Sequence, residues 1–89
     1  MKAVVTVIGK DRVGIMSAVC DLMAQYNINI LDISQTVMQE FFTMVMLVDI
    51  STSSVPVADL RDLLSKAGEE QNLSIRIQRE DIFQAMHRI

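Results

Sequence analysis

The chain has 89 residues, enough for one domain and too few for two. Hydrophobic residues make up 51% and charged residues 21%, a globular composition that excludes a disordered chain. The net charge of −3 argues against a nucleic-acid-binding face and against a basic helix on a membrane surface. No apolar run reaches the roughly 18 residues of a membrane span. A single cysteine and no recognisable signal peptide indicate a cytoplasmic protein.

The first part of the chain predicts a strand followed by a helix. Residues 2–8 carry apolar side chains on both faces, as a central strand does. Residues 13–26 repeat apolar side chains at helical spacing, and Asn27 follows at a plausible C-terminal cap. The single cysteine, Cys20, lies inside this helical pattern, and we interpret it as a small hydrophobic side chain of the core.

The segment that joins them, residues 8–15, is the candidate functional loop. Gly9 suits a tight turn at the end of the strand, and Gly14 suits a close approach of backbone at the helix start. Asp11 can accept hydrogen bonds from the first free helix N–H groups. A helix N-terminus with glycines and an arginine, Arg12, favours binding of a carboxylate or phosphate. An ordinary strand-to-helix turn would carry the same residues, so both interpretations stay open here.

The middle of the chain predicts two strands, over residues 28–38 and 41–50. The second of these is apolar on both faces, which again indicates a central strand. The junction Gln39-Glu40 lacks Gly and Asn, so the closeness of the two strands predicts a hairpin there and the turn residues do not.

The last part predicts a loop, a helix, a strand and a tail. Residues 51–54 form a serine- and threonine-rich loop, and Pro56 lies near a helix start behind a serine cap. Residues 73–78 alternate between apolar and polar side chains, as a half-exposed edge strand does. Residues 80–89 place apolar side chains at helical spacing, which predicts a short amphipathic C-terminal helix.

The order of these elements predicts an α+β fold of the ferredoxin-like βαββαβ type. We expect a single domain over residues 1–89, with a four-stranded antiparallel sheet, two helices on one of its faces, and the tail helix of residues 80–89. Right-handed crossovers place the first and third strands in the middle of the sheet. Apolar residues of the third strand then point away from the helices. Such a face usually marks a contact surface, and it predicts a homodimer.

Two motifs carry a resemblance to a known family. The segment Val7-Ile-Gly-Lys-Asp-Arg-Val-Gly-Ile15, a helix, and then Tyr26-Asn-Ile-Asn-Ile30 resemble an ACT domain. The form most similar is the small stand-alone bacterial ACT protein, like the domains of the glycine-cleavage repressor. The resemblance implies the ferredoxin-like fold, binding of amino acids or other small ligands where two domains meet, and regulation of an attached or partner enzyme.

By position, the resemblance also implies a set of ligand-binding residues. Those in the loop are Asp11, Arg12, Val13, Gly14 and Ile15, and those at the start of the second strand, expected from the partner subunit, are Asn29 and Ile30. The amide of Asn29 offers a donor and an acceptor, which suits a zwitterion. Local capping of the strand start is the competing interpretation of Asn29.

We expect no catalytic residues, no metal site and no cofactor. The only histidine, His87, lies in the tail, no cluster has metal-ligand spacing, and no nucleophile elbow is present. The first strand has no aromatic residue, which argues against an RNA-binding domain of this topology. The leading hypothesis is a non-catalytic dimeric regulator that binds a small amino-acid-like ligand and acts on a separate enzyme or regulator. The alternative is an interaction or oligomerisation module without a small ligand.

Overall fold

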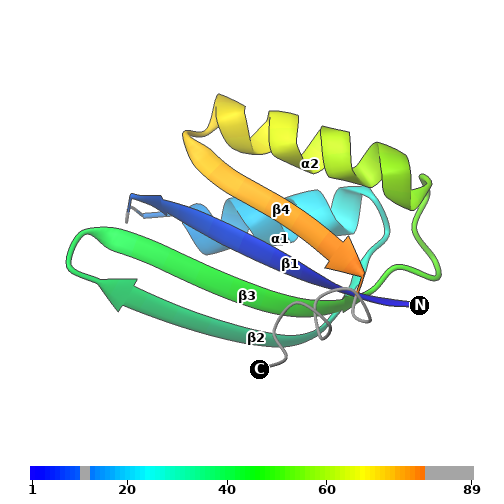
Figure 1. Ribbon diagram of the computed structural model, residues 1–89, viewed down its shortest axis with the longest axis horizontal. Coiled ribbons are helices and arrows are strands. Elements are labelled where there is room, and N and C mark those ends of the chain that lie inside the picture. The colour runs from blue at the N-terminus through cyan, green and yellow to red at the C-terminus, as the bar shows by residue number, and fades with distance from the viewer. Residues whose placement is uncertain (11–12, 80–89) are drawn as a thin grey trace, which may run out of the picture.

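The computed structural model describes residues 1–10 and 13–79 and shows the predicted order of elements (Figure 1). The strands and helices are β1 Lys2–Lys10, α1 Ile15–Gln25, β2 Asn29–Met38, β3 Phe41–Asp49, α2 Val57–Glu70 and β4 Leu73–Arg79. Residues 11–12 and the expected tail helix over residues 80–89 lie outside the described residues.

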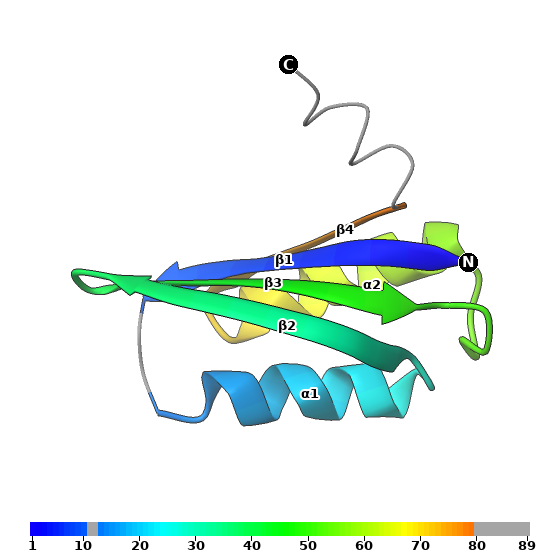
Figure 2. The same cartoon turned by 90° about the horizontal axis from the view of Figure 1, so that it is seen from below.

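The four strands form one antiparallel sheet in the order β2-β3-β1-β4. Both helices cover the same face of this sheet, and the other face carries no helix of the described chain (Figure 2). The predicted ferredoxin-like fold is therefore confirmed. The first and third strands lie in the middle and β4 lies at an edge, as the alternation of its side chains predicts.

The core lies between the sheet and the helices. β1 and β3 contribute every second residue to it, and β4 contributes Leu73, Ile75 and Ile77. Each helix buries one stripe against the sheet, made by Ile15, Val19 and Met23 in α1 and by Leu60, Leu64 and Gly68 in α2. Full burial of one aliphatic side chain stabilises the fold by about 1.5–3 kcal/mol. Because this burial needs both the sheet and the helices in place, each layer stabilises the other.

Two glycines of the candidate loop have the opposite roles to those predicted. Gly9 lies inside β1, and a Cβ at this position would collide with Cδ2 of Leu73 in β4. Gly9 therefore permits close approach of a neighbouring strand and ends no strand. Gly14 has φ 92°, a left-handed conformation, and no heavy atom of the described chain lies within 4 Å of the place where its Cβ would be. Its glycine is required by the backbone angle.

Both helices end in the same way. Tyr26 caps α1 and Asn27 follows with φ 57°, while Gln71 caps α2 and Asn72 follows with φ 60°. Asparagine tolerates this left-handed conformation better than most residues, so it is a frequent substitute for glycine after a helix. The cap of α1 is thus Tyr26, and the predicted cap residue Asn27 takes the left-handed position one residue later.

The start of α2 differs from the prediction of a serine cap. Pro56 is the N-cap residue, its carbonyl accepts a hydrogen bond of 2.9 Å from the N–H of Leu60, and no side chain caps the helix. The hydroxyl of Ser53 instead bonds to Val55, accepting from its N–H at 3.3 Å and donating to its carbonyl at 2.9 Å. The serine stabilises the loop before the helix, because a short hydroxyl side chain readily bonds backbone two residues away.

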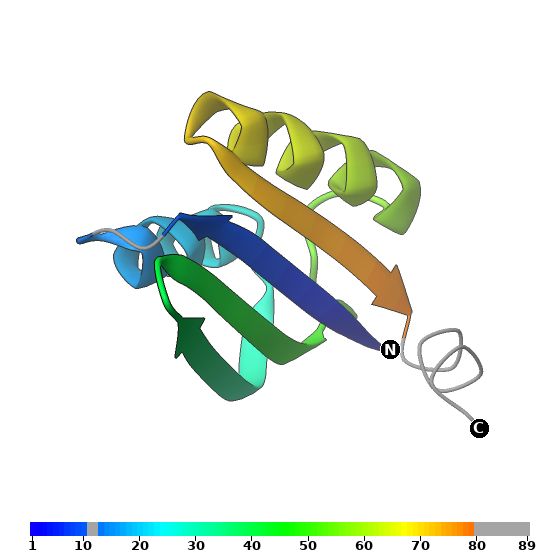
Figure 3. The ribbon, with the colours of Figure 1, turned by 60° about the vertical axis from the view of Figure 1, so that its left-hand side comes forward.

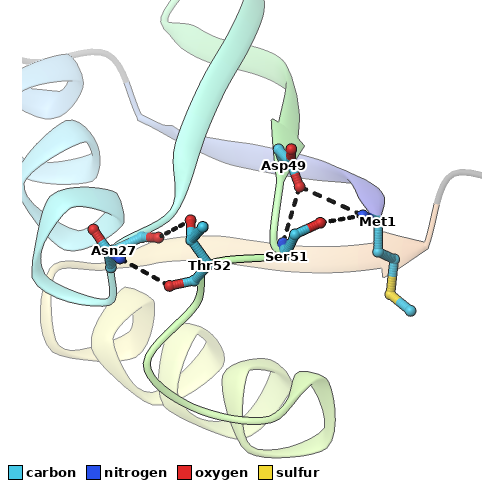
Figure 4. Close-up of polar contacts among 5 residues, drawn as sticks. All are labelled: Met1, Asn27, Asp49, Ser51 and Thr52. Carbon is cyan, nitrogen blue, oxygen red and sulfur yellow. Dashed lines mark hydrogen bonds and ion pairs between the residues drawn. The ribbon is translucent and has the colours of Figure 1, made fainter.

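Hydrogen bonds join the α1–β2 turn to the β3–α2 loop at one end of the sheet (Figure 4). The amide of Asn27 donates to the carbonyl of Thr52 at 2.8 Å, and the Thr52 hydroxyl donates to the carbonyl of Asn27 at 3.2 Å. Nearby, the N–H of Ser51 donates to Oδ1 of Asp49 at 2.9 Å, and the amino group of Met1 contacts both residues. These bonds connect the end of α1 to the loop before α2.

The edge strand β2 is exposed along almost its whole length. Only Ile30 is half-buried, and the apolar side chains exposed beyond it are Leu31, Ile33, Val37 and Met38. The pairing with β3 shifts between Ile30 and Asp32, which leaves Leu31 as the extra residue of a bulge. The sequence alternation predicts that Leu31, Ile33 and Val37 share one face; Ile33 and Val37 do share the helix-side face, and the bulge takes Leu31 out of that alternation.

The residues of β3 that point away from the helices, on the second face of the sheet, are mostly apolar, as predicted. Ile8 and Phe41 are 46% and 52% exposed there, next to the half-buried Val45 and Leu47 of β3. This part of the second face gives the described chain an apolar surface that no helix of its own covers, whereas the exposed Ile33 and Val37 of β2 lie on the helix side.

Candidate ligand-binding site

The start of α1 has the features expected of a site for a negatively charged group. The carbonyl of Gly14 accepts the first helical hydrogen bond, from the N–H of Ala18 at 3.0 Å. The N–H groups of the preceding helical turn have no acceptor within the helix, and no described side chain caps them. The first turn of α1 holds no acidic residue, so no carboxylate within that turn offsets the partial positive charge of the helix end.

The residues at this helix start have different surroundings. Val13 is 98% exposed, and Gly14 is exposed as well. Ile15 is only 2% exposed and packs in the core. Ile15 can therefore offer a ligand its backbone N–H and not its side chain. The predicted site residues Asp11 and Arg12 lie outside the described residues.

The other two predicted site residues lie at the opposite end of the sheet. Asn29 begins β2, and the 11 residues of α1 separate it from Gly14, a rise of about 16 Å. Asn29 is exposed and pairs across the sheet with Asp49, and its side chain makes no hydrogen bond within residues 1–10 and 13–79. Ile30 packs against the core. One chain thus does not bring its own loop and its own Asn29 together.

The carboxylate opposite Asn29 is held in its charged form. Hydrogen bonds from the side chain and the backbone N–H of Ser51 lower the pKa of Asp49 from its ordinary value of 3.8, and the amino group of Met1 adds to the effect. The Asp49 carboxylate is therefore charged at neutral pH, and it lies 3.5 Å from the positively charged amino group of Met1.

The described residues contain no group of three or more His, Cys, Asp or Glu side chains placed to hold a metal ion. None of the described helices is long and apolar enough to cross a membrane.

A second candidate binding surface was not predicted from the sequence. A groove of about 410 Å³ lies between α2 and the outer edge of β4, lined by Arg61, Ser65, Ile75, Arg76, Ile77 and Gln78. Arg61 and Ser65 are four residues apart, which places them on one side of α2. That spacing, read beside an arginine in a predicted edge strand, is the signal that could have found the groove.

The comparisons with known proteins agree with the fold and with the resemblance in the loop. The family model of the ACT domain matches residues 2–78. A UPF0237 protein from Methanopyrus kandleri is 52% identical over 88 residues, which cover 99% of this chain and 98% of that protein. An ACT domain protein from Streptococcus pneumoniae is 43% identical, with a TM-score of 0.83 and 97% of each chain covered.

A larger structural neighbour contains a similar unit. A protein described as a glycine cleavage system transcriptional repressor is 29% identical, with a TM-score of 0.73. The match covers 88% of this chain and 44% of that one, so the fold occurs there as one part of a longer protein.

Proposed function

We propose, because this chain belongs to the ACT domain family, that it is a non-catalytic regulatory protein that binds a small amino-acid-like ligand as a homodimer. The observation that carries the proposal is the start of α1. Its first N–H groups are uncapped in the described chain, and apart from its chain neighbours no described atom lies within 4 Å of the place where a Cβ of Gly14 would be. Such a helix end favours a carboxylate, the group that all amino acids share.

The shape of β2 supports a dimer formed edge to edge. β2 is an edge strand of ten residues with exposed apolar side chains, and an unpaired edge of this kind pairs readily with another strand. A two-fold axis makes two copies of β2 antiparallel, since each copy must present the same surface to the other. The start of one β2 then lies beside the end of the other.

That arrangement completes the ligand site. The end of β2 at Met38 lies at the same end of the sheet as Lys10, the last residue of β1 before the candidate loop. Asn29 of the second copy would therefore approach the side of the molecule where α1 begins. α1 packs on the β2 side of the sheet, which shortens the gap (Figure 2). The helix N–H groups would hold a ligand carboxylate, and the second copy's Asn29 would hold its ammonium group through the amide oxygen.

Two further parts of the proposal come from the sequence. We expect the regulated activity to lie on a separate enzyme or regulator, and we expect the protein to act in the cytoplasm. The similarity to a protein described as a transcriptional repressor supports a regulatory role in general terms.

A thermal-shift screen of the purified protein against the amino acids tests this function. A ligand at about 100 times its Kd stabilises the folded state by roughly 2.7 kcal/mol, which raises the Tm of a domain this small by about 10 °C or more. Asn29→Ala should remove the shift without changing the Tm of the free protein, because the exposed Asn29 side chain makes no hydrogen bond within the described chain. Gln35→Ala is the matched control, since Gln35 is an exposed amide on the same strand.

Four outcomes are distinct. Loss of the shift in Asn29→Ala and not in Gln35→Ala supports the composite site. Equal binding by wild type and Asn29→Ala refutes it. A flat screen, combined with a light-scattering mass of two chains, would favour the alternative of an interaction module without a small ligand, and a mass of one chain would refute the dimer.

A further inference from the structure

We propose that the outer edge of β4 binds an extended acidic segment of another protein, which adds to the sheet as a fifth strand. This surface lies at the opposite edge from β2 and apart from the start of α1, so the inference is independent of the proposed ligand site (Figures 1 and 3). Three observations carry it: an open strand edge, a groove beside that edge, and arginines on both sides of the groove.

The edge is available for pairing. β4 is the last strand of the sheet, so its outer backbone groups have no neighbouring strand in the described chain. α2 runs alongside it and leaves the groove of about 410 Å³ between them. A second hollow of about 320 Å³ continues the groove past Ser65 toward Glu69 and Leu73. An extended polypeptide that pairs with a sheet edge needs a groove of this kind beside the edge for its side chains.

The charges select the occupant. Arg61 extends from α2 on the helix side of the sheet, and Arg76 points to the opposite face, because its neighbours Ile75 and Ile77 are buried toward the helices. Both arginines are exposed, and neither makes an ion pair with any residue of the described chain. Successive side chains of an added strand alternate between the two faces. Two adjacent acidic residues would therefore meet Arg61 and Arg76 in turn, and guanidinium groups bind carboxylates in two-point contacts.

A second copy of this chain is a poor occupant of the same edge. Arg76 is the middle residue of the seven-residue strand Leu73–Arg79. A symmetric antiparallel pair that used all seven residues of both β4 strands would place Arg76 of one copy directly opposite Arg76 of the other. Like charges at that position destabilise a strand pair, so the arginine disfavours self-association and leaves the edge for a partner of opposite charge.

The experiment uses the whole chain and a defined peptide. A fluorescein-labelled peptide of sequence TVTEDVTV is titrated with the protein, and fluorescence anisotropy reports its binding at low and at high salt. We expect saturable binding that weakens with salt, since the contacting charges are exposed. Arg61→Glu and Arg76→Glu should each weaken binding about fivefold to tenfold. Lys66→Glu is the matched control, because it makes the same charge change at an exposed site of α2 outside the lining of the groove.

The location is checked by amide chemical shifts. Bound peptide should move the amides of β4 and leave those of β2 unchanged. A peptide with lysines in place of its two acidic residues should not bind. The proposal is overturned by absent binding, by equal effects of Arg76→Glu and Lys66→Glu, or by shifts confined to β2. It is also overturned if the β4 amides move with protein concentration alone, because the edge would then be an interface between copies.

Discussion

The two edges of this sheet differ in how their side chains are used. β4 alternates between buried and exposed residues, since Leu73, Ile75 and Ile77 all point into the core beneath α2. β2 has no such alternation, and its inward-facing Ile33 and Val37 stay exposed. The core-facing side chains of β4 are therefore covered by the helices of the same chain. Those of β2 are left exposed as apolar surface in the described chain. An edge position in the sheet thus does not by itself determine whether a strand buries its core-facing side chains.

The largest expected effect is a difference between β4 and β2 in the stability lost when one isoleucine is truncated. Ile77→Ala should lower the free energy of unfolding by about 2–4 kcal/mol at any protein concentration, because Ile77 is only 4% exposed in one chain. Ile33→Ala should cost under about 1 kcal/mol in dilute protein, since Ile33 is 36% exposed, and more in concentrated protein if β2 pairs. Urea unfolding at two protein concentrations checks both. Equal losses for both variants in dilute protein would remove the distinction between the edges.

The next effect in size depends on the close packing of α2 against β4 at Gly68. Alanine usually stabilises a helix relative to glycine, by up to about 1 kcal/mol. At Gly68, however, a Cβ would lie 2.7 Å from the carbonyl oxygen of Leu73, so Gly68→Ala should destabilise the fold by roughly 1–3 kcal/mol. Gly9→Ala should cost less, because the atom it meets is the end of the Leu73 side chain, which can turn. Thermal unfolding gives the order, and a more stable Gly68→Ala variant would contradict the close packing.

A smaller, stabilising effect is expected in the turn that leads out of β2. Gln39 has φ 57°, the left-handed angle that short hairpin turns require and that glycine adopts without strain. Gln39→Gly should therefore raise the free energy of unfolding by about 0.5–1 kcal/mol. Glu40→Gly is the control, because Glu40 is not among the described residues with positive φ, so glycine there relieves no strain, adds flexibility and removes an exposed ion pair with Lys10. A loss of stability in both variants would show that the turn is not strained.

The smallest effect is a pH dependence at the end of β3 that pairs with the start of β2. The folded-state pKa of Asp49 is depressed, chiefly by the hydrogen bonds from Ser51, so the charged carboxylate stabilises the fold above its ordinary pKa of 3.8. That contribution is lost as pH falls through the lower folded-state value. Asp49→Asn should therefore reduce the drop in stability between pH 5 and pH 3, as measured by urea unfolding. A drop of unchanged size would show that Asp49 contributes nothing.

The fold could be predicted because its periodic signals are local. The alternation of residues 73–78 and the two-sided apolar pattern of β3 identify an edge strand and a central strand without any tertiary information. The roles of the glycines could not be predicted, because they depend on distant neighbours. The close approach at Gly9 involves Leu73, which is far away in the sequence and adjacent only in the folded sheet.

The candidate site was only partly predictable for a related reason. Motif positions indicated the start of α1, where Gly14 is the N-cap residue and no side chain of residues 1–10 and 13–79 caps the helix. Motif positions cannot show that Asn29 lies at the far end of α1, or that the Ile15 side chain is buried in the core. Which residues meet in a site depends on the topology of the fold, which the spacing of a short motif does not encode.

The matching ends of the two helices have a consequence for the whole molecule. The segments β1-α1-β2 and β3-α2-β4 each run from a central strand through a helix and a left-handed asparagine to an edge strand, at Asn27 in one half and Asn72 in the other. Exchanging the halves reproduces the strand order β2-β3-β1-β4, so the domain has an internal two-fold pseudosymmetry. β2 and β4 are thus equivalent positions of one repeated unit, and their divergence into an apolar and a basic edge is a difference of side chains within a shared backbone plan.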